Sequence, residues 1–288
     1  MKVLIAPDKF RGSASAAEVA CAIAAGAESA GATTRQQPLA DGGEGTLEVL
    51  GGANRTTTVT GPLGDPVDAP WRLHRAEAVI EMASASGLEL VGGPAGNDPL
   101  AASTAGTGEL ISSAVDLGAR RIIVGLGGSA TTDGGLAALR ALYPLPRLKG
   151  VELIVACDVD TTFVDAAEVF APQKGASPAQ VALLTRRLQR LAEVYRQDHG
   201  IDVTATPGTG AAGGLAGGLL VAGGHLRPGF ELVADEVDLD GAFADVDLVI
   251  TGEGRLDDQS FHGKVVGGVV GWATDRGVPV LAIAGTVD

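Results

Sequence analysis

Charged side chains stand close together in two glycine-bearing segments near the start of the sequence. Residues 6–13 carry Asp8 and Lys9, and residues 40–46 carry Asp41 with a second acid three positions further on. A carboxylate beside a cation could dock an anionic substrate, and paired carboxylates could hold Mg²⁺ or accept a hydroxyl proton. Ordinary solvated charges in the first segment and a plain glycine turn in the second are the alternatives.

Glycines and residues with a hydroxyl group are most concentrated at residues 127–135, directly after the apolar run 122–126. Backbone N–H groups left open by the missing Cβ can cradle a phosphate, and hydroxyls add donors. The phosphate nest that we predict consists of Gly127, Gly128, Ser129 and Thr131. Gly106 and Thr107 form a similar turn earlier in the chain. A tight strand-to-helix turn with a hydroxyl N-cap is the alternative for residues 127–135.

Further acids and cations follow later apolar runs. Asp158 comes after the run that ends at Cys157, and Lys174 precedes a long polar-faced stretch. A last group suits a phosphate-and-metal site and consists of Glu253, Arg255, Asp257 and Lys264. In an open parallel sheet, ligands bind where strands end and helices begin, so these side chains could share one site. A solvated polar loop is the alternative for the last group.

Several familiar motifs are absent from the sequence. Gly263 and Lys264 lack the glycine five residues earlier that a P-loop needs. Residues 208–213 match G-x-G-x-x-G without following a clear apolar strand, which disfavours a dinucleotide site. The four histidines show no metal spacing, and no G-x-S-x-G elbow occurs. Zinc-hydrolase and esterase mechanisms are therefore disfavoured.

The charge balance restricts the class of partner. The 35 acidic and 21 basic residues give a formal net charge of −14, which repels nucleic acid and anionic membranes. The two cysteines lie in apolar settings, as free thiols of a reducing compartment do. No apolar run reaches membrane-spanning length. We expect a cytoplasmic protein with a small-molecule substrate, no nucleic-acid or membrane partner, and assembly as a homodimer.

The pattern of apolar residues predicts the strands and helices that position these side chains. Short apolar runs alternate with helix-like stretches, as in βαβ units with parallel strands. The apolar runs are residues 3–6, 122–125, 151–157, 248–251 and 278–283. Short strands joined by turns are predicted at residues 56–60, 67–73 and 78–82, as a small antiparallel excursion. Helices are predicted at residues 15–29, 108–117 and 178–197, the first with a capping box at Ser15.

The length of 288 residues allows two ordinary α/β domains. We predict two α/β lobes with mainly parallel sheets of the Rossmann or flavodoxin type and an active-site cleft between the lobes. Residues 1–80 plus 240–288 would form a discontinuous first lobe, and residues 81–239 would form a second lobe inserted into it.

Taken together, the loops resemble the bacterial glycerate kinase family over essentially the whole chain. The shared words are A-P-D-K-F at residues 6–10, A-D-G-G-E-G-T at 40–46, T-G-P-L-G at 60–64, I-E-M-A-S-A-S-G-L at 80–88, G-T-G-E-L-I at 106–111, G-G-S-A-T-T-D-G-G at 127–135, A-C-D-V at 156–159, F-A-P-Q-K-G-A at 170–176, G-A-A-G-G at 210–214 and V-I-T-G-E-G-R-L-D-D-Q-S at 249–260. Two departures are the short segment 143–147 and the pair Thr161-Thr162, where the family has Asn-Pro.

The resemblance implies ATP and Mg²⁺ as cofactors, D-glycerate as acceptor and phosphoglycerate as product, usually assigned as 2-phosphoglycerate. Two α/β lobes with the site in the cleft between them are implied as well. A kinase or phosphatase for another small hydroxy acid, and a non-catalytic module that senses glycerate or nucleotide, are the alternative functions.

Phosphoryl transfer needs alignment, charge neutralisation and exclusion of water, and hypothetical roles follow from these needs. The nest, with Gly106 and Thr107, would cradle the ATP phosphates, and Asp158 with Glu253 or Asp257 would hold Mg²⁺. Asp41 would orient the acceptor hydroxyl and take its proton, with Asp8 as second choice. The cations predicted to bind the glycerate carboxylate or the γ-phosphate are Lys9, Arg255, Lys174 and Lys264.

Overall fold

The computed structural model describes residues 1–261 and 263–288, with every side chain among them except that of Gln259. The chain forms two compact units, the first made of Met1–Gly51 with Pro228–Asp288 and the second of Gly52–Arg227. The lobe borders predicted from the sequence differ from the borders of these units. The predicted ones would cut the strand Glu77–Glu81 and the helix Leu239–Ala242. No helix among the described residues is long and apolar enough to cross a membrane.

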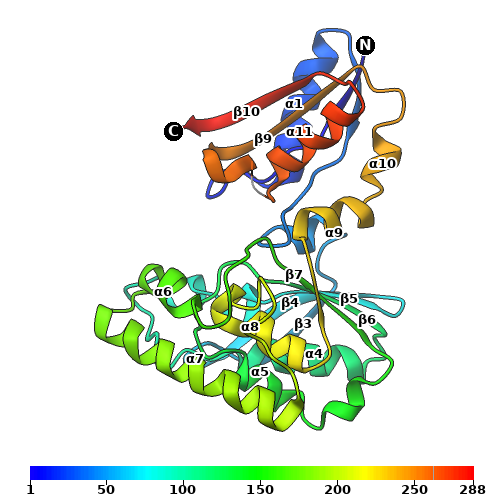
Figure 1. The fold of residues 1–288 in the computed structure, drawn as a ribbon. Helices are drawn as coiled ribbons and strands as arrows, with labels where there is room; N and C mark the ends of the chain where they lie inside the picture. Colours follow the sequence, from blue (N-terminus) through cyan, green and yellow to red (C-terminus); the bar gives the residue numbers. More distant parts are fainter. Residues whose placement is uncertain (262) are drawn as a thin grey trace. The chain divides into compact units, whose positions relative to one another are not determined.

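The first unit is built on a four-stranded parallel sheet in the order β10-β9-β1-β2 (Figure 1). Its strands are β1 (Lys2–Ile5), β2 (Thr33–Gln36), β9 (Leu248–Leu256) and β10 (Val280–Val287). Its helices are α1 (Ala16–Ser29), α2 (Thr46–Val49), α9 (Gly229–Glu236), α10 (Leu239–Ala242), the 3₁₀ turn η4 (Asp258–Phe261) and α11 (Val265–Asp275). Alternate residues of β1 enter different clusters: Val3 and Ile5 pack with α1, and Leu4 packs with residues of α9 and α11. This parallel sheet confirms the predicted α/β class.

Strand β9 is longer than the apolar run at residues 248–251 from which it was predicted. The strand continues to Leu256, and β10 pairs with it as far as that residue. Gly252 lies inside this ladder, where a Cβ would stand 2.3 Å from the carbonyl oxygen of Ile283. Glycine is therefore required here by the close approach of the neighbouring strand, and not by a turn.

The second unit is built on a six-stranded sheet in the order β3-β4-β5-β6-β7-β8. Its strands are β3 (Arg55–Thr60), β4 (Pro66–His74), β5 (Glu77–Glu81), β6 (Arg121–Gly125), β7 (Glu152–Ala156) and β8 (His225–Arg227). The strands β5 to β8 pair in parallel, whereas β3, β4 and β5 pair antiparallel. The predicted antiparallel excursion is thus confirmed, and it belongs to the second unit because β5 pairs with β6.

Helices of the second unit carry most of its apolar core. They are α3 (Ala83–Ser86), η1 (Glu89–Val91), α4 (Ala105–Asp116), α5 (Leu136–Ala141), η2 (Leu145–Leu148), α6 (Ala166–Phe170), η3 (Pro172–Lys174), α7 (Pro178–His199) and α8 (Ala211–Val221). Helix α7 starts with a capping box: the N–H of Gln180 donates to Ser177 Oγ (3.4 Å), and the N–H of Ser177 donates to Gln180 Oε1 (2.8 Å). The N-terminus of the longest helix is thereby fixed next to Lys174.

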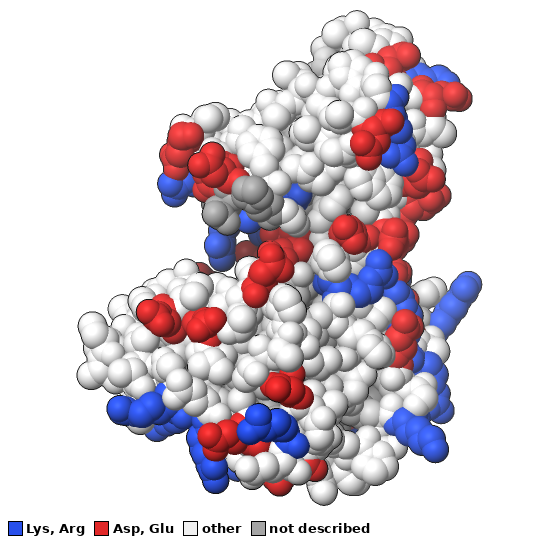
Figure 2. Space-filling view, viewed as in Figure 1, with Lys and Arg blue, Asp and Glu red and all other residues white. Residues whose placement is uncertain are grey.

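Charge is unevenly distributed over the surface. On the face drawn in Figure 2, acidic and basic side chains lie beside one another in several small groups, with wide uncharged areas between the groups. Among the described residues, this face offers no continuous basic surface of the kind that nucleic-acid-binding proteins present.

Replacing Ser177 by Ala should lower the free energy of unfolding by about 1 kcal/mol, because the first turn of α7 loses its side-chain acceptor. Urea unfolding followed by circular dichroism measures this difference. The exposed Ser13 serves as the matched control, since Ser13→Ala removes a hydroxyl outside any cap. Equal midpoints for the two variants would show that the capping box does not stabilise α7.

Candidate active site

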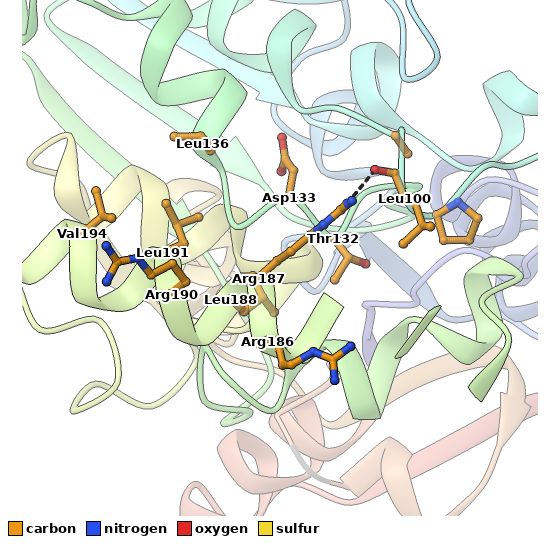
Figure 3. A pocket seen from close by; sticks show the side chains of 12 residues that line it. Leu100, Thr132, Asp133, Leu136, Arg186, Arg187, Leu188, Arg190, Leu191 and Val194 are labelled. Atoms are coloured by element: carbon orange, nitrogen blue, oxygen red, sulfur yellow. Dashed lines mark hydrogen bonds between the residues drawn. The ribbon is translucent and has the colours of Figure 1, made fainter. Parts of the chain in front are cut away.

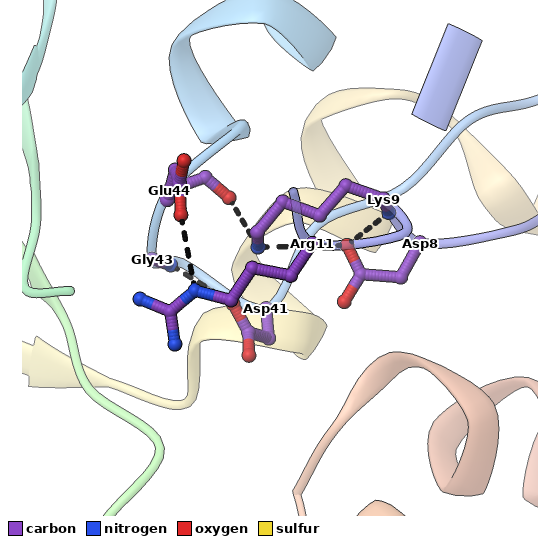
Figure 4. A network of polar contacts seen from close by, with 6 residues as sticks. All are labelled: Asp8, Lys9, Arg11, Asp41, Gly43 and Glu44. Atoms are coloured by element: carbon purple, nitrogen blue, oxygen red, sulfur yellow. Dashed lines mark hydrogen bonds and ion pairs between the residues drawn. The ribbon is translucent and has the colours of Figure 1, made fainter. Parts of the chain in front are cut away.

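In the first unit, the two acidic segments predicted from the sequence contact each other (Figure 4). Lys9 Nζ donates to the backbone carbonyl of Glu44 (2.6 Å) and lies 3.8 Å from Asp8 Oδ1. Arg11 Nε lies 3.7 Å from Glu44 Oε2. Lys9 therefore joins the end of β1 to the turn that carries Asp41, and we call Asp8, Lys9 and Asp41 the acidic cluster.

Backbone contacts hold the acidic cluster in place. The N–H of Asp8 donates to the carbonyl of Gly252 on β9 (2.8 Å), and the N–H of Gly43 donates to Asp41 Oδ1 (3.1 Å). Gly45 has a φ of +91° immediately before α2, a conformation that favours glycine. The glycines of the A-D-G-G-E-G-T word thus shape the turn, while the acids remain available for chemistry.

The acidic cluster lies partly outside water. Asp8 is 8% exposed, and burial raises the pKa of its carboxyl to about 7. The charge of Lys9 opposes that rise in pKa, whereas the negative charges of Asp41 and Glu253 add to it. Carboxylates outnumber cations here, so the surroundings favour a further positive charge.

The carboxylate of Glu253 also suits a bound cation. Its Oε1 atom is buried and has no hydrogen-bond partner among the described residues. A buried carboxylate oxygen without a partner is costly, and a bound Mg²⁺ would satisfy it. Within residues 1–261 and 263–288, however, no three His, Cys, Asp or Glu side chains form a metal-binding group. Phosphate oxygens and water would therefore have to complete the coordination of Mg²⁺.

Arg255, Asp257 and Lys264 each have a defined place in the structure of the first unit. Arg255 is exposed on β9, and its guanidinium forms an ion pair with Asp288, with Nε donating at 2.6 Å. The N–H of Asp257 donates to Ser260 Oγ (3.0 Å), and Lys264 is the N-cap residue of α11. Because residues two apart on a strand point to the same face, Glu253 and Arg255 lie on one face of β9.

In the second unit, the loop that follows β6 is anchored by a buried cation. Lys174 is 3% exposed, and its Nζ donates to Ser129 Oγ and to the carbonyl of Thr131, both at 2.7 Å. Gly128 is exposed and has a φ of +67°. The residues Gly127 to Ser129 thus form a loop with an accessible backbone and a lysine behind it. Lys174 holds this loop from its buried side, and its predicted contact with a phosphate stays a prediction.

Gly106 and Thr107 are packed inside the second unit, and their predicted phosphate contact stays a prediction. Both are buried in the first turn of α4, and the hydroxyl of Thr107 lies 2.8 Å from that of Ser86. A Cβ on Gly106 would stand 2.1 Å from the carbonyl oxygen of Thr60. The side chain of Thr131 is also fully buried, with its Oγ1 3.4 Å from the carbonyl oxygen of Ala212.

Two residues that support the loop were not among the sequence predictions. Asn97 Nδ2 donates to the carbonyls of Ala130 (3.0 Å) and Lys174 (2.9 Å). Asp133 accepts from the N–H and the hydroxyl of Thr104 at 3.0 and 2.8 Å, and burial raises its pKa. Asp133 stands within the glycine-rich word and could have been singled out there, whereas nothing around Asn97 in the sequence indicates its role.

Asp158 is half-buried directly after β7 in the second unit, whereas Glu253 and Asp257 belong to the first. The three predicted metal ligands are therefore contributed by different units, and their joint action is a prediction.

Comparisons with known proteins agree on one family. The model of the glycerate kinase family matches residues 3–143 and 144–288. The chain is 43% identical to glycerate 2-kinase of Escherichia coli K12 (100% of this chain, 86% of the relative) and 42% identical to glycerate kinase of Bacillus subtilis 168 (100% and 85%). A solved structure of a candidate glycerate kinase 2 from Salmonella typhimurium LT2 is similar with a TM-score of 0.87 and 42% identity, over 99% of this chain and 87% of that one.

The buried Lys174 should make stability depend on pH. Burial lowers its pKa from 10.5 to about 7, so between these values the unfolded chain binds a proton that the folded chain does not. Stability should therefore rise with pH above about 7, at up to about 1.4 kcal/mol per pH unit. Urea unfolding at pH 7.0 and 8.5 measures the rise, which Lys174→Met should remove. The exposed Lys149 provides the control Lys149→Met, and an unchanged pH slope in Lys174→Met would contradict the assignment.

Proposed function

Because the chain belongs to the glycerate kinase family, we propose that it transfers the γ-phosphoryl group of ATP to D-glycerate, with Mg²⁺ as cofactor. The products are ADP and phosphoglycerate, and 2-phosphoglycerate is the isomer we favour. The observation that carries the proposal beyond the family is the acidic cluster, in which Lys9 joins two carboxylate-bearing segments. A cation held between carboxylates suits an acceptor that has both a carboxylate and a hydroxyl group.

The glycine loop of the second unit is the part suited to the donor phosphates. Backbone N–H groups in a positive-φ turn form an anion-binding concavity, and the turn at Gly128 is exposed. We propose that residues Gly127 to Ser129 hold phosphate oxygens of ATP, with Lys174 fixing the loop from its buried side. A rigid loop reduces the reorganisation that the transition state would otherwise require.

Asp41 is the group we propose to take the acceptor proton. It is half-buried, so a small acid can reach it, whereas Asp8 is 8% exposed. The glycerate hydroxyl oxygen forms a bond to the γ-phosphorus while the bond to the bridging oxygen of ADP breaks. The hydroxyl proton moves to Asp41, and Lys9 holds the glycerate carboxylate.

Mg²⁺, when bound, neutralises charge on the phosphate oxygens. Glu253 would be its first ligand because of its unpartnered buried Oε1, and Asp158 or Asp257 would add a second carboxylate. Lys264 remains a proposed phosphate contact. Arg255 would first have to release Asp288. Cytoplasmic location and a homodimer stay predictions.

Wild-type protein incubated with ATP, Mg²⁺ and D-glycerate should release ADP and form 2-phosphoglycerate, which proton-coupled ³¹P NMR distinguishes from the 3-isomer. A panel of small hydroxy acids should give slower ADP release than D-glycerate. Turnover of another hydroxy acid with D-glycerate inert would support the alternative kinase. ATP binding without ADP formation on any acceptor would support a sensing module.

Replacing Asp41 by Asn should lower kcat by about 100-fold or more, because a neutral amide cannot take the proton. The affinity for ADP should change little, since Asp41 is proposed to contact the acceptor. The matched control is Glu44→Gln, an exposed acid of the same turn, for which we expect nearly wild-type turnover. Unchanged turnover in Asp41→Asn would remove Asp41 from the reaction.

A further inference from the structure

A pocket of about 500 Å³ lies within the second unit, between α7 and the segment that contains Leu100 (Figure 3). Sites for small organic ligands enclose roughly 300–1,000 Å³, so the pocket has the size of a binding site. The acidic cluster contributes nothing to its lining. No step proposed above uses this pocket.

Apolar side chains form most of the wall. Leu136 at the start of α5, Leu100, and Leu191 and Val194 of α7 line the pocket. A surface of this kind suits a compact apolar or aromatic body. D-Glycerate is small and polar throughout, so it cannot be the molecule that fills this space.

One buried polar atom in the wall lacks a partner. Thr132 is 2% exposed and lines the pocket, and its Oγ1 has no hydrogen-bond partner among the described residues. A buried hydroxyl without a partner is unfavourable, and a polar atom of a ligand would satisfy it. The ligand therefore needs a hydrogen-bonding group on its apolar body.

Arginines of α7 add positive charge to the same pocket. Arg187 reaches across to the carbonyl of Leu100 (3.0 Å), and Arg190 pairs with Glu193 (2.6 Å). Arg186 also lines the pocket and forms no such contact with any described residue. Asp133 also lines the pocket, but its carboxylate accepts hydrogen bonds from Thr104, so Arg186 remains to face an anionic group of a ligand.

The pocket lies near the glycine loop, because one of its lining residues follows that loop closely in the sequence. Thr132 is four residues after Gly128, so their Cα atoms are at most about 14 Å apart. A single ligand with an apolar ring system at one end and a chain of phosphates at the other could contact both. A nucleoside triphosphate has this form.

We propose that this pocket binds the base and ribose of the phosphoryl donor, with a polar atom of the nucleoside bonded to Thr132 Oγ1 and Arg186 facing the anionic side of the ligand. This inference rests on the proposed function, since it assigns the nucleoside end of the donor whose phosphates lie at Gly127 to Ser129.

Two variants and one control test the assignment by calorimetric titration with ADP. Val194→Trp fills the pocket and should raise the Kd for ADP about tenfold or more. The control Leu117→Trp places the same side chain on an exposed site of the same unit and should leave that Kd unchanged. With ATP saturating, Val194→Trp should also keep the KM for D-glycerate of the wild type.

Thr132→Val separates lost binding from lost folding. The variant should raise the Kd for ADP about fivefold, the effect of one hydrogen bond. Its Tm without ligand should equal or exceed that of the wild type, because the hydroxyl removed has no partner in the empty pocket. A merely structural role for Thr132 would not combine a retained Tm with weaker ADP binding.

The outcomes distinguish the two proposals. A wild-type protein that turns over D-glycerate, together with unchanged ADP affinity in Val194→Trp and Thr132→Val, would overturn the pocket assignment and leave the kinase reaction intact. A wild-type protein that neither binds ADP nor phosphorylates D-glycerate would overturn both.

Discussion

The loop after β6 depends on the hydrogen bonds of one buried side chain, that of Lys174. It bonds to Ser129 Oγ and to the carbonyl of Thr131, and so ties the start of α7 to the loop after β6. The cost of removing a cation from water appears as a pKa lowered to about 7. Because Lys174 anchors the loop, its glycine backbone stays in one conformation. A loop that is already ordered can bind phosphates without reorganisation.

The acidic cluster of the first unit differs from this loop, because its carboxylates outnumber its cations. Asp8 and the Oε1 atom of Glu253 are buried, and Lys9 opposes the rise in the pKa of Asp8 only in part. Such a cluster would bind a divalent cation and a hydroxy acid together more readily than either alone, since each relieves the charge left by the other. The units contribute different chemistry to the proposed reaction: a neutral backbone nest in one and a carboxylate-rich cluster in the other.

The sequence predicted much of the fold, but it could not predict how the glycines are used. Apolar runs located β1, β6, β7, β9 and β10, a capping box located α1, and a long polar-faced stretch located α7. Strand β2 was missed because Thr-Thr-Arg-Gln has no apolar run, and the end of β9 was misplaced because glycines of a tight ladder resemble those of a turn. Burial was equally hidden: Lys174 was expected to bind phosphate, and Thr107 was expected to be accessible.

The central claim is that the glycine loop holds the donor phosphates while Asp41 faces the acceptor. A crystal structure with a non-hydrolysable ATP analogue, Mg²⁺ and D-glycerate measures both contacts at once. We predict phosphate oxygens within hydrogen-bond distance of the N–H groups of Gly127 to Ser129, and a glycerate hydroxyl about 3 Å from an Asp41 oxygen. Phosphates bound away from this loop, or a glycerate hydroxyl that does not face Asp41, would contradict the claim.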